Sequence, residues 1–136
     1  MTTQATVYIV DDNEAVLDGL SLLFESADLK AKAFGSCAEF LSSTPSSQEI
    51  ACLILDVRMP KMTGPELQAE LLHRKIDLPI IFLSGHGNIP LAVKTVQLGA
   101  IDFLTKPVDS QQLLDKVQKA LTLSANRHKE NAIYRT

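Results

Sequence analysis

Five short apolar runs, each followed by a stretch of helical period, constrain the fold of this chain more than any other feature. Runs of four or five apolar residues have the length of buried strands. Alternation of strands and helices predicts a doubly wound, five-stranded parallel sheet with right-handed crossovers and helices on both faces. The predicted strands are residues 6–10, 31–34, 51–55, 79–83 and 101–104.

The predicted strands differ in their patterns. Residues 52–55 (CLIL) and 80–83 (IIFL) do not alternate between apolar and polar side chains, which is typical of strands buried on both faces of a parallel sheet. Residues 30–34 (KAKAF) alternate, with lysines on one side. That alternation indicates an edge strand.

Capping signals mark the ends of the predicted helices. Either Asp12 or Asn13 is suited to cap the first helix. Gly99 stands where a glycine would end the fourth helix. The residues that fit other N-terminal caps or capping boxes are Ser36 with Glu39, Thr63 with Glu66, and Asn88.

Composition excludes several classes of function. Apolar residues make up 46% of the chain and charged residues 21%, so a core can form. The net charge of −3 argues against a domain built to bind nucleic-acid phosphates. Without a basic leader or an apolar run of about 18 residues, we expect a soluble, cytoplasmic protein that makes no membrane contact. Cys37 and Cys52 lack metal-ligand spacing and are expected to be reduced packing residues.

The last part of the chain differs in character from the rest. Residues 127–131 are polar, although apolar residues at 123, 125 and 133 are compatible with a longer last helix. We therefore expect one domain over residues 1–122. Residues 123–136 are interpreted as a linker or a helix extension toward another domain of a longer parent chain.

Charged and hydroxyl side chains follow four of the predicted strands. Asp11 and Asp12 follow the first strand, Asp56 the third and Ser84 the fourth, and Lys106 comes soon after the fifth. Because the carboxyl ends of parallel strands meet at one edge of the sheet, we expect these side chains to lie together. Each alone would be a helix cap, a turn residue or a solvated lysine. Their joint placement favours a functional site.

Three carboxylates at one edge need a cation in addition to Lys106. Crowded carboxylates repel and raise one another's pKa. A hard divalent ion such as Mg²⁺ suits them, because it binds one or two carboxylates, keeps waters and accepts phosphate oxygens, and Mn²⁺ is expected to substitute. His86 is the only histidine or cysteine near these strand ends, which makes zinc a poor candidate.

Three stretches, in order, resemble the receiver domains of two-component response regulators. They are residues 7–12 (VYIVDD), 55–64 (LDVRMPKMTG) and 99–107 (GAIDFLTKP), and the resemblance covers roughly residues 5–122. Residues 84–90 (SGHGNIP) with Ala92 and Val93 resemble the FixJ-type subgroup, whose members usually carry a LuxR-type helix-turn-helix. This chain contains no such helix-turn-helix. The implied fold is flavodoxin-like, with strand order 2-1-3-4-5.

The resemblance implies a role for each matching residue. Asp56 would be the phosphoacceptor. The implied Mg²⁺ ligands are Asp11, Asp12, Asp56 and the backbone carbonyl of Arg58. The implied phosphoryl-contacting and switch residues are Ser84, Lys106 and Phe103, with a cis bond between Lys106 and Pro107.

The implied function is a switch and not an enzyme. A sensor histidine kinase would phosphorylate Asp56, slow autodephosphorylation would follow, and the face formed by the fourth helix, fifth strand and fifth helix would change. The resemblance also implies homodimerisation through the fourth helix and fifth strand. Transcription would be controlled through an attached DNA-binding domain, which alone would contact DNA. The alternative is a stand-alone receiver that acts by protein–protein contact.

Two residues are candidates for tuning the lifetime of the phosphorylated form. Arg58 and His86 lie two residues beyond Asp56 and Ser84, from where their side chains can gate water. Solvated loop residues are the alternative interpretation.

Two rival functions use similar residues. An aspartate-nucleophile phosphohydrolase would place its nucleophile in an Asp-x-Asp turn after the first strand and would carry a substrate cap. This sequence instead reads Asp11-Asp12-Asn13 and has no insertion that would form a cap. A pseudo-receiver that is never phosphorylated is not supported, because all the site residues are present.

Overall fold

The computed structural model describes residues 5–43, 49–85 and 88–134, with the backbone alone for residues 130–134. The strands pair in parallel in the order β2-β1-β3-β4-β5, which confirms the predicted fold. The elements in chain order are β1 (Thr6–Val10), α1 (Glu14–Ser26), β2 (Lys30–Phe34), α2 (Cys37–Ser42), β3 (Ala51–Leu55), α3 (Gly64–His73), β4 (Ile80–Ser84), α4 (Ile89–Gln97), β5 (Asp102–Thr105) and α5 (Ser110–Tyr134).

Three strands differ by one residue from their predicted bounds. β2 begins one residue earlier, at Lys30, whereas β4 and β5 begin and end one residue later. Ser84 and Thr105, the last residues of β4 and β5, pair with each other. The Ser84 carbonyl also accepts a hydrogen bond from the Lys106 N–H at 2.7 Å. Backbone pairing thus carries both strands one residue past their apolar runs.

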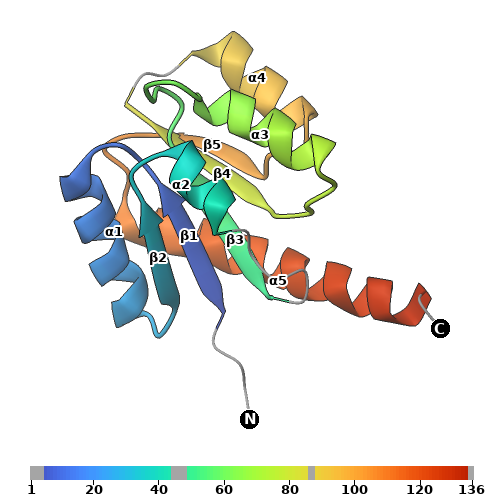
Figure 1. Ribbon diagram of the computed structural model, residues 1–136. Helices are drawn as coiled ribbons and strands as arrows, with labels where there is room; N and C mark the ends of the chain where they lie inside the picture. Colours follow the sequence, from blue (N-terminus) through green and yellow to red (C-terminus); the bar gives the residue numbers. More distant parts are fainter. Residues whose placement is uncertain (1–4, 44–48, 86–87, 135–136) are drawn as a thin grey trace.

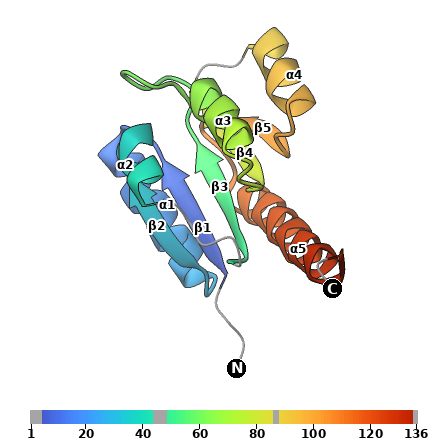
Figure 2. The ribbon, with the colours of Figure 1, turned by 45° about the vertical axis from the view of Figure 1, so that its right-hand side comes forward.

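Helices cover both faces of the sheet. α1 and α5 lie on one face, and α2, α3 and α4 lie on the other (Figures 1 and 2). Successive residues of β1 alternate between the two cores, with Val7 and Ile9 in one and Tyr8 and Val10 in the other. β1 is buried throughout, whereas β2 exposes its lysines at the end of the sheet. The edge position predicted for β2 is confirmed.

The caps of α1 and α3 are formed by side chains close to the carboxyl end of the sheet. Asn13, and not Asp12, caps α1 by accepting hydrogen bonds from backbone N–H groups of the first turn. Thr63 and Glu66 form the predicted capping box, in which each side chain accepts from the other residue's N–H. Asp12 is therefore not needed as a cap.

The remaining cap predictions are confirmed with one difference. The Ser36 hydroxyl accepts from the Glu39 N–H, but the Glu39 carboxylate accepts from the Gly35 N–H, so this box is not reciprocal. Asn88 caps α4, and Gly99 follows that helix with a φ of 111°. Such a positive φ favours glycine.

Residues 123–134 continue α5 without a break. Of the two forms expected for this segment, a linker or a helix extension, the structure shows the helix extension. Ser124 is 3% exposed, and its hydroxyl oxygen accepts a hydrogen bond from the Ala51 N–H at 3.2 Å. Arg127 Nη1 lies 2.5 Å from Asp77 Oδ1. These contacts join the extension to β3 and to the loop before β4, and its last turns extend beyond the sheet (Figure 1). Among the described residues, no helix combines the length and apolar character that crossing a membrane requires.

Both cysteines are free and buried, which confirms their prediction as reduced packing residues. Burial raises the pKa of Cys37 to about 11 and that of Cys52 to about 12. Both thiols therefore stay protonated at neutral pH and are poor nucleophiles.

Candidate functional site

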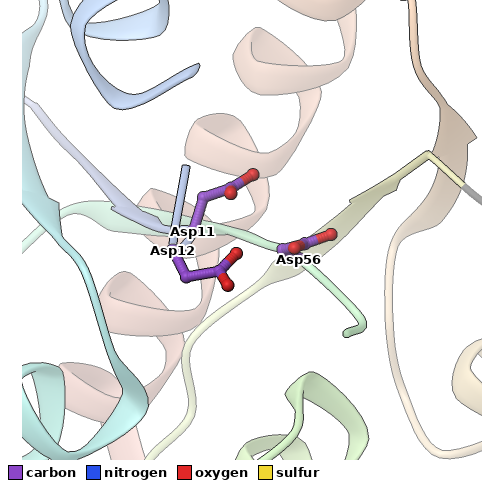
Figure 3. Close-up of side chains that lie close together, drawn as sticks. All are labelled: Asp11, Asp12 and Asp56. Carbon is purple, nitrogen blue, oxygen red and sulfur yellow. The ribbon is translucent and has the colours of Figure 1, made fainter. Parts of the chain in front are cut away.

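Three acidic side chains meet at the carboxyl end of the sheet. Asp11 and Asp12 follow β1, and Asp56 follows the neighbouring strand β3. One oxygen from each lies within 4.8 Å of the others (Figure 3). Backbone hydrogen bonds hold two of these residues: Asp11 N donates to Phe34 O at 3.1 Å, and Asp56 N to Val10 O at 3.0 Å. The sheet itself therefore fixes the positions of the acids.

Lys106 supplies the positive charge that the chain itself contributes to the cluster. Its Nζ lies 2.7 Å from Asp11 Oδ2 and 3.7 Å from Asp56 Oδ1. The other oxygen of Asp11 accepts a hydrogen bond from the Asn13 N–H at 2.9 Å. The bond between Lys106 and Pro107 is cis, as the resemblance implied. Among the described side chains, one ammonium faces three carboxylates, so these groups together carry excess negative charge.

The environment of Asp56 disfavours its charged form. The residue is 8% exposed. Burial is the main cause that raises the pKa of its carboxyl above the ordinary aspartate value, and repulsion by Asp11 and, to a smaller extent, Asp12 adds to it. Lys106 and the N–H of Val57 oppose this shift only in part. A further cation near Asp56 would therefore be bound favourably.

The donor set fits a hard divalent cation of the Mg²⁺ type. Its three side-chain donors are carboxylate oxygens from Asp11, Asp12 and Asp56, and Asp12 is exposed. Mg²⁺–oxygen bonds of about 2.1 Å require ligand oxygens about 4.2 Å apart at most. Small side-chain rotations would bring these oxygens to that spacing. The expected fourth donor, the carbonyl of Arg58, stays a prediction.

Gly64 brings the loop after β3 against Asp56. A Cβ atom at this position would lie 2.1 Å from the backbone oxygen of Asp56 and 3.1 Å from the Phe82 ring. The Gly64 N–H donates to the Val57 carbonyl at 3.0 Å. Only a residue without a side chain fits, so Gly64 sets the conformation of the backbone that follows Asp56.

Ser84 and Phe103 lie on the two strands beyond β3 in the sheet. Ser84 is buried at the end of β4. Phe103, on β5, is partly buried and stacks on Phe82 with ring centroids 6.0 Å apart. Because Phe82 also adjoins Gly64, packed side chains connect the backbone at Asp56 with the predicted switch residue.

The structure describes only one of the two residues predicted to tune dephosphorylation. Arg58 is exposed and lines a shallow apolar pocket with Met59, Pro60 and Pro65. His86 lies outside the described residues. The tuning role predicted for Arg58 and His86 stays a prediction.

Sequence reasoning missed the structural roles of Gly64 and Phe82. In the sequence, Gly64 is recognisable only as part of a motif, and Phe82 only as part of an apolar strand. The available sequence signal is that Gly64 directly follows the helix cap Thr63. Most other residues favour a helix more than glycine does, so a glycine at this position indicates a special backbone requirement. No local signal shows that the Phe82 ring lies between Gly64 and Phe103.

Residues 7–118 match the family model of the response regulator receiver domain. The chain belongs to this family. Solved structures agree: response regulator StyR has a TM-score of 0.91 at 38% identity, covering 98% of this chain and 67% of StyR. The FixJ-N structure has a TM-score of 0.78 at 32% identity, covering 89% of this chain and 96% of FixJ-N. As a receiver domain, the chain is a signalling protein and not a classical enzyme.

Curated relatives of this receiver domain include regulators from several bacteria. Response regulator protein TmoT of Ectopseudomonas mendocina is 48% identical over 129 residues, and TodT of Pseudomonas putida is 45% identical over 128. The transcriptional regulatory protein FixJ of Bradyrhizobium diazoefficiens is 35% identical over 133 residues. The alignments cover 95%, 94% and 98% of this chain but 58%, 56% and 64% of those proteins. The chain thus spans little more than half the length of its relatives.

Substituting Gly64 by alanine should lower the free energy of unfolding by about 1–3 kcal/mol, because the added methyl group collides with backbone. The matched control is Gly19→Ala in the middle of α1, where a Cβ atom meets nothing within 4 Å. That change should raise stability by about 0.5–1 kcal/mol. Urea unfolding of both variants measures the two changes in the free energy of unfolding. A stabilised Gly64→Ala variant would contradict the close approach.

Replacing Asp56 with asparagine should stabilise the metal-free protein at neutral pH. The Asp56 carboxyl contributes fully to stability below its unfolded pKa, near 3.8, and this contribution is lost as pH rises through the higher folded pKa. The gain in the variant should therefore be largest near pH 7 and vanish below about pH 4. Thermal unfolding in the presence of a chelator, at several pH values, measures this gain in stability. Asp18→Asn, on the exposed face of α1, is the control for exchanging an aspartate for an asparagine. A gain independent of pH would contradict the raised pKa.

Proposed function

We propose that this receiver domain is a Mg²⁺-dependent phosphoacceptor that takes a phosphoryl group onto Asp56 from a phosphohistidine of a sensor histidine kinase. The observation that supports this most is the buried Asp56 carboxylate beside Asp11, Asp12 and the ammonium of Lys106. Membership of the response regulator family supports a histidine kinase as donor. The proposed setting is the cytoplasm, where such a kinase domain would meet it.

Phosphoryl transfer would form one bond and break one. An Asp56 oxygen attacks phosphorus while the bond from phosphorus to the imidazole nitrogen breaks, and the leaving imidazole takes a proton from water. Mg²⁺, or Mn²⁺ in its place, held by the carboxylates and the Arg58 carbonyl, would shield the negative charge of the phosphoryl oxygens. Lys106 and Ser84 would offer an ammonium and a hydroxyl to the oxygens of the product.

Lys106 would exchange partners on phosphorylation. It now contacts Asp11 at 2.7 Å, and Asp56 lies 3.7 Å away, so a short movement brings the ammonium to a phosphoryl group on Asp56. Ser84 would move toward the same oxygens. Phe103, which is partly buried on Phe82, would turn inward into the space that this movement opens. The surface formed by α4, β5 and α5 would thereby change between two states.

The exposed face of α4 suits association with a second copy of the chain. Ile89, Val93 and Val96 are exposed apolar residues, and Ile89 is 80% exposed. Their spacings of four and three residues place them on one side of the helix. We infer that phosphorylated copies dimerise through this stripe on α4 and the adjoining β5, because phosphorylation alters the same face.

The effector function would depend on a further domain attached to this receiver domain. The FixJ relative is a transcriptional regulatory protein, and the proposal is transcription control through an attached DNA-binding domain, which alone would contact DNA. The alternative is a stand-alone receiver that acts by protein–protein contact.

Arg58 and His86 are proposed to tune the lifetime of the acyl phosphate. An unchanged half-life in both Arg58→Ala and His86→Ala variants would remove that role.

Incubation with acetyl phosphate and Mg²⁺ should add one phosphoryl group to the chain, seen as a single mass increase. Asp56→Asn should abolish the increase. Chelator should lower its rate by at least about tenfold, because the metal shields the phosphoryl charge. Absence of the increase would support a pseudo-receiver, and rapid multiple turnover of phosphate esters would support a phosphohydrolase.

Beryllofluoride, which mimics the phosphoryl group, should convert the monomer to a dimer in sedimentation measurements. Val93→Asp should weaken this dimer by at least about tenfold, because a charge would be buried in an apolar contact. Leu22→Asp is the control, since Leu22 is an exposed leucine on α1, away from α4. An unchanged monomer with beryllofluoride, or equal effects of the two variants, would overturn the dimer proposal.

A further inference from the structure

The helix α4 is held on the domain by few contacts. The structure describes every residue of this helix, and Thr95 is the only one of them that is buried. Leu91 is partly buried against the apolar core. The exposed apolar residues of the helix are Ile89, Val93 and Val96. A helix that buries so little apolar surface is displaced at a low cost in free energy, so the few contacts of its inner side decide how firmly it is held.

One of these contacts is made by Gln68 of α3, the helix that lies beside α4 (Figures 1 and 2). Gln68 is 1% exposed, and its Nε2 donates a hydrogen bond to the Thr95 carbonyl at 2.9 Å. The same carbonyl accepts a second hydrogen bond, from the Ala100 N–H at 3.0 Å. Because it has this second donor, the Thr95 carbonyl stays paired when Gln68 is removed.

The oxygen of the same amide has no partner of this kind. Because the Thr95 carbonyl can only accept, the NH₂ group of Gln68 must face it, and this fixes which way round the amide lies. Oε1 is then buried without a hydrogen-bond partner among the described residues. A buried acceptor without a partner costs more free energy than one hydrogen bond between neutral groups contributes. Gln68 therefore makes the packed position of α4 less stable than an apolar side chain of the same size would.

Displacement of α4 would remove this cost. Once Nε2 is released from Thr95, the amide of Gln68 is free to rotate about its last bond, because such torsions have broad energy profiles. Either end of the amide would then reach the water that enters between α3 and α4. The free-energy difference between the packed and the displaced position of α4 is therefore smaller with Gln68 than with an apolar residue.

We propose that Gln68 is a positioning residue that keeps α4 ready to move. Its buried amide, bonded at one end only, raises the free energy of the packed position and so increases the population of displaced positions. Where this inference concerns signalling, it rests on the proposed function. Phosphorylation of Asp56 would then need to supply less free energy to change the surface that includes α4. Loss of the amide would hold α4 in its packed position.

Hydrogen exchange of the backbone amides, measured on the unphosphorylated protein without Mg²⁺, tests the inference. In Gln68→Met, an unbranched apolar side chain replaces the amide and leaves no strong acceptor unpaired. The amides of α4 should exchange at least about fivefold more slowly in this variant, because opening of the helix no longer relieves a cost. The amides of α1, on the other face of the sheet, should exchange as before. Gln68→Leu is the second variant and should slow the same amides.

The control is Gln112→Leu, which replaces a glutamine at an exposed position of α5 and should leave exchange in α4 unchanged. Unchanged or faster exchange of α4 in both Gln68 variants would contradict the proposal, and unchanged exchange is the result expected if a water molecule pairs with Oε1. Slowing confined to buried strands such as β1, whose amides exchange through global unfolding, would mean that Gln68 acts on overall stability alone. That outcome would also overturn the proposal.

The link to signalling is tested by the binding of beryllofluoride in the presence of Mg²⁺. Gln68→Met should bind it at least about fivefold more weakly than the unchanged chain, because the position of α4 that beryllofluoride favours becomes less populated. Equal affinity together with slower exchange in α4 would remove this link. The exchange experiment involves no phosphoryl group, and the slowing should also appear when Gln68→Met is combined with Asp56→Asn. Its failure is therefore distinct from a failure of the phosphoacceptor proposal.

Discussion

The attraction between Lys106 and the buried acids is the interaction on which the arrangement of this molecule depends. Three carboxylates lie at the ends of two adjacent central strands, with oxygens within 4.8 Å of one another. Without a counter-charge, their repulsion and the burial of Asp11 and Asp56 would oppose folding at this edge. Lys106 reaches them from the loop after β5, on the far side of β4. One ion pair thus joins the first strand of the chain to its last.

The packing around Asp56 connects the backbone of this residue with Phe103, the proposed switch residue on β5. Gly64 lies against the Asp56 backbone, the Phe82 ring lies against Gly64, and Phe103 stacks on Phe82. These contacts are close-packed, so a movement at one end has no empty space to absorb it. β5 pairs with β4 along its whole length. Pairing in the sheet therefore restricts movement of the strand backbones. The side chains at the carboxyl ends of the strands keep more freedom to move.

The parallel sheet and the strand-end residues could be predicted from the sequence, because both follow from local patterns, whereas the strand order was implied only by the family resemblance. Buried parallel strands are continuous apolar runs, and residues after such runs share one edge. The partner of Lys106 could not be predicted, because its choice of Asp11 over Asp56 depends on distances between three strands. The contact of Ser124 with Ala51 and that of Arg127 with Asp77 join residues 73 and 50 positions apart. A polar sequence with few apolar residues gave no local sign that this part of α5 packs on the domain.

The unbroken course of α5 has a geometric consequence for anything joined to its end. A helix turns by about 100° and advances about 1.5 Å with each residue. Ser124 and Arg127 fix the rotation of this helix against the sheet. The number of residues beyond Arg127 therefore sets the direction in which a following structure faces. Adding or deleting single residues there would change the orientation of an attached domain without altering the receiver domain itself.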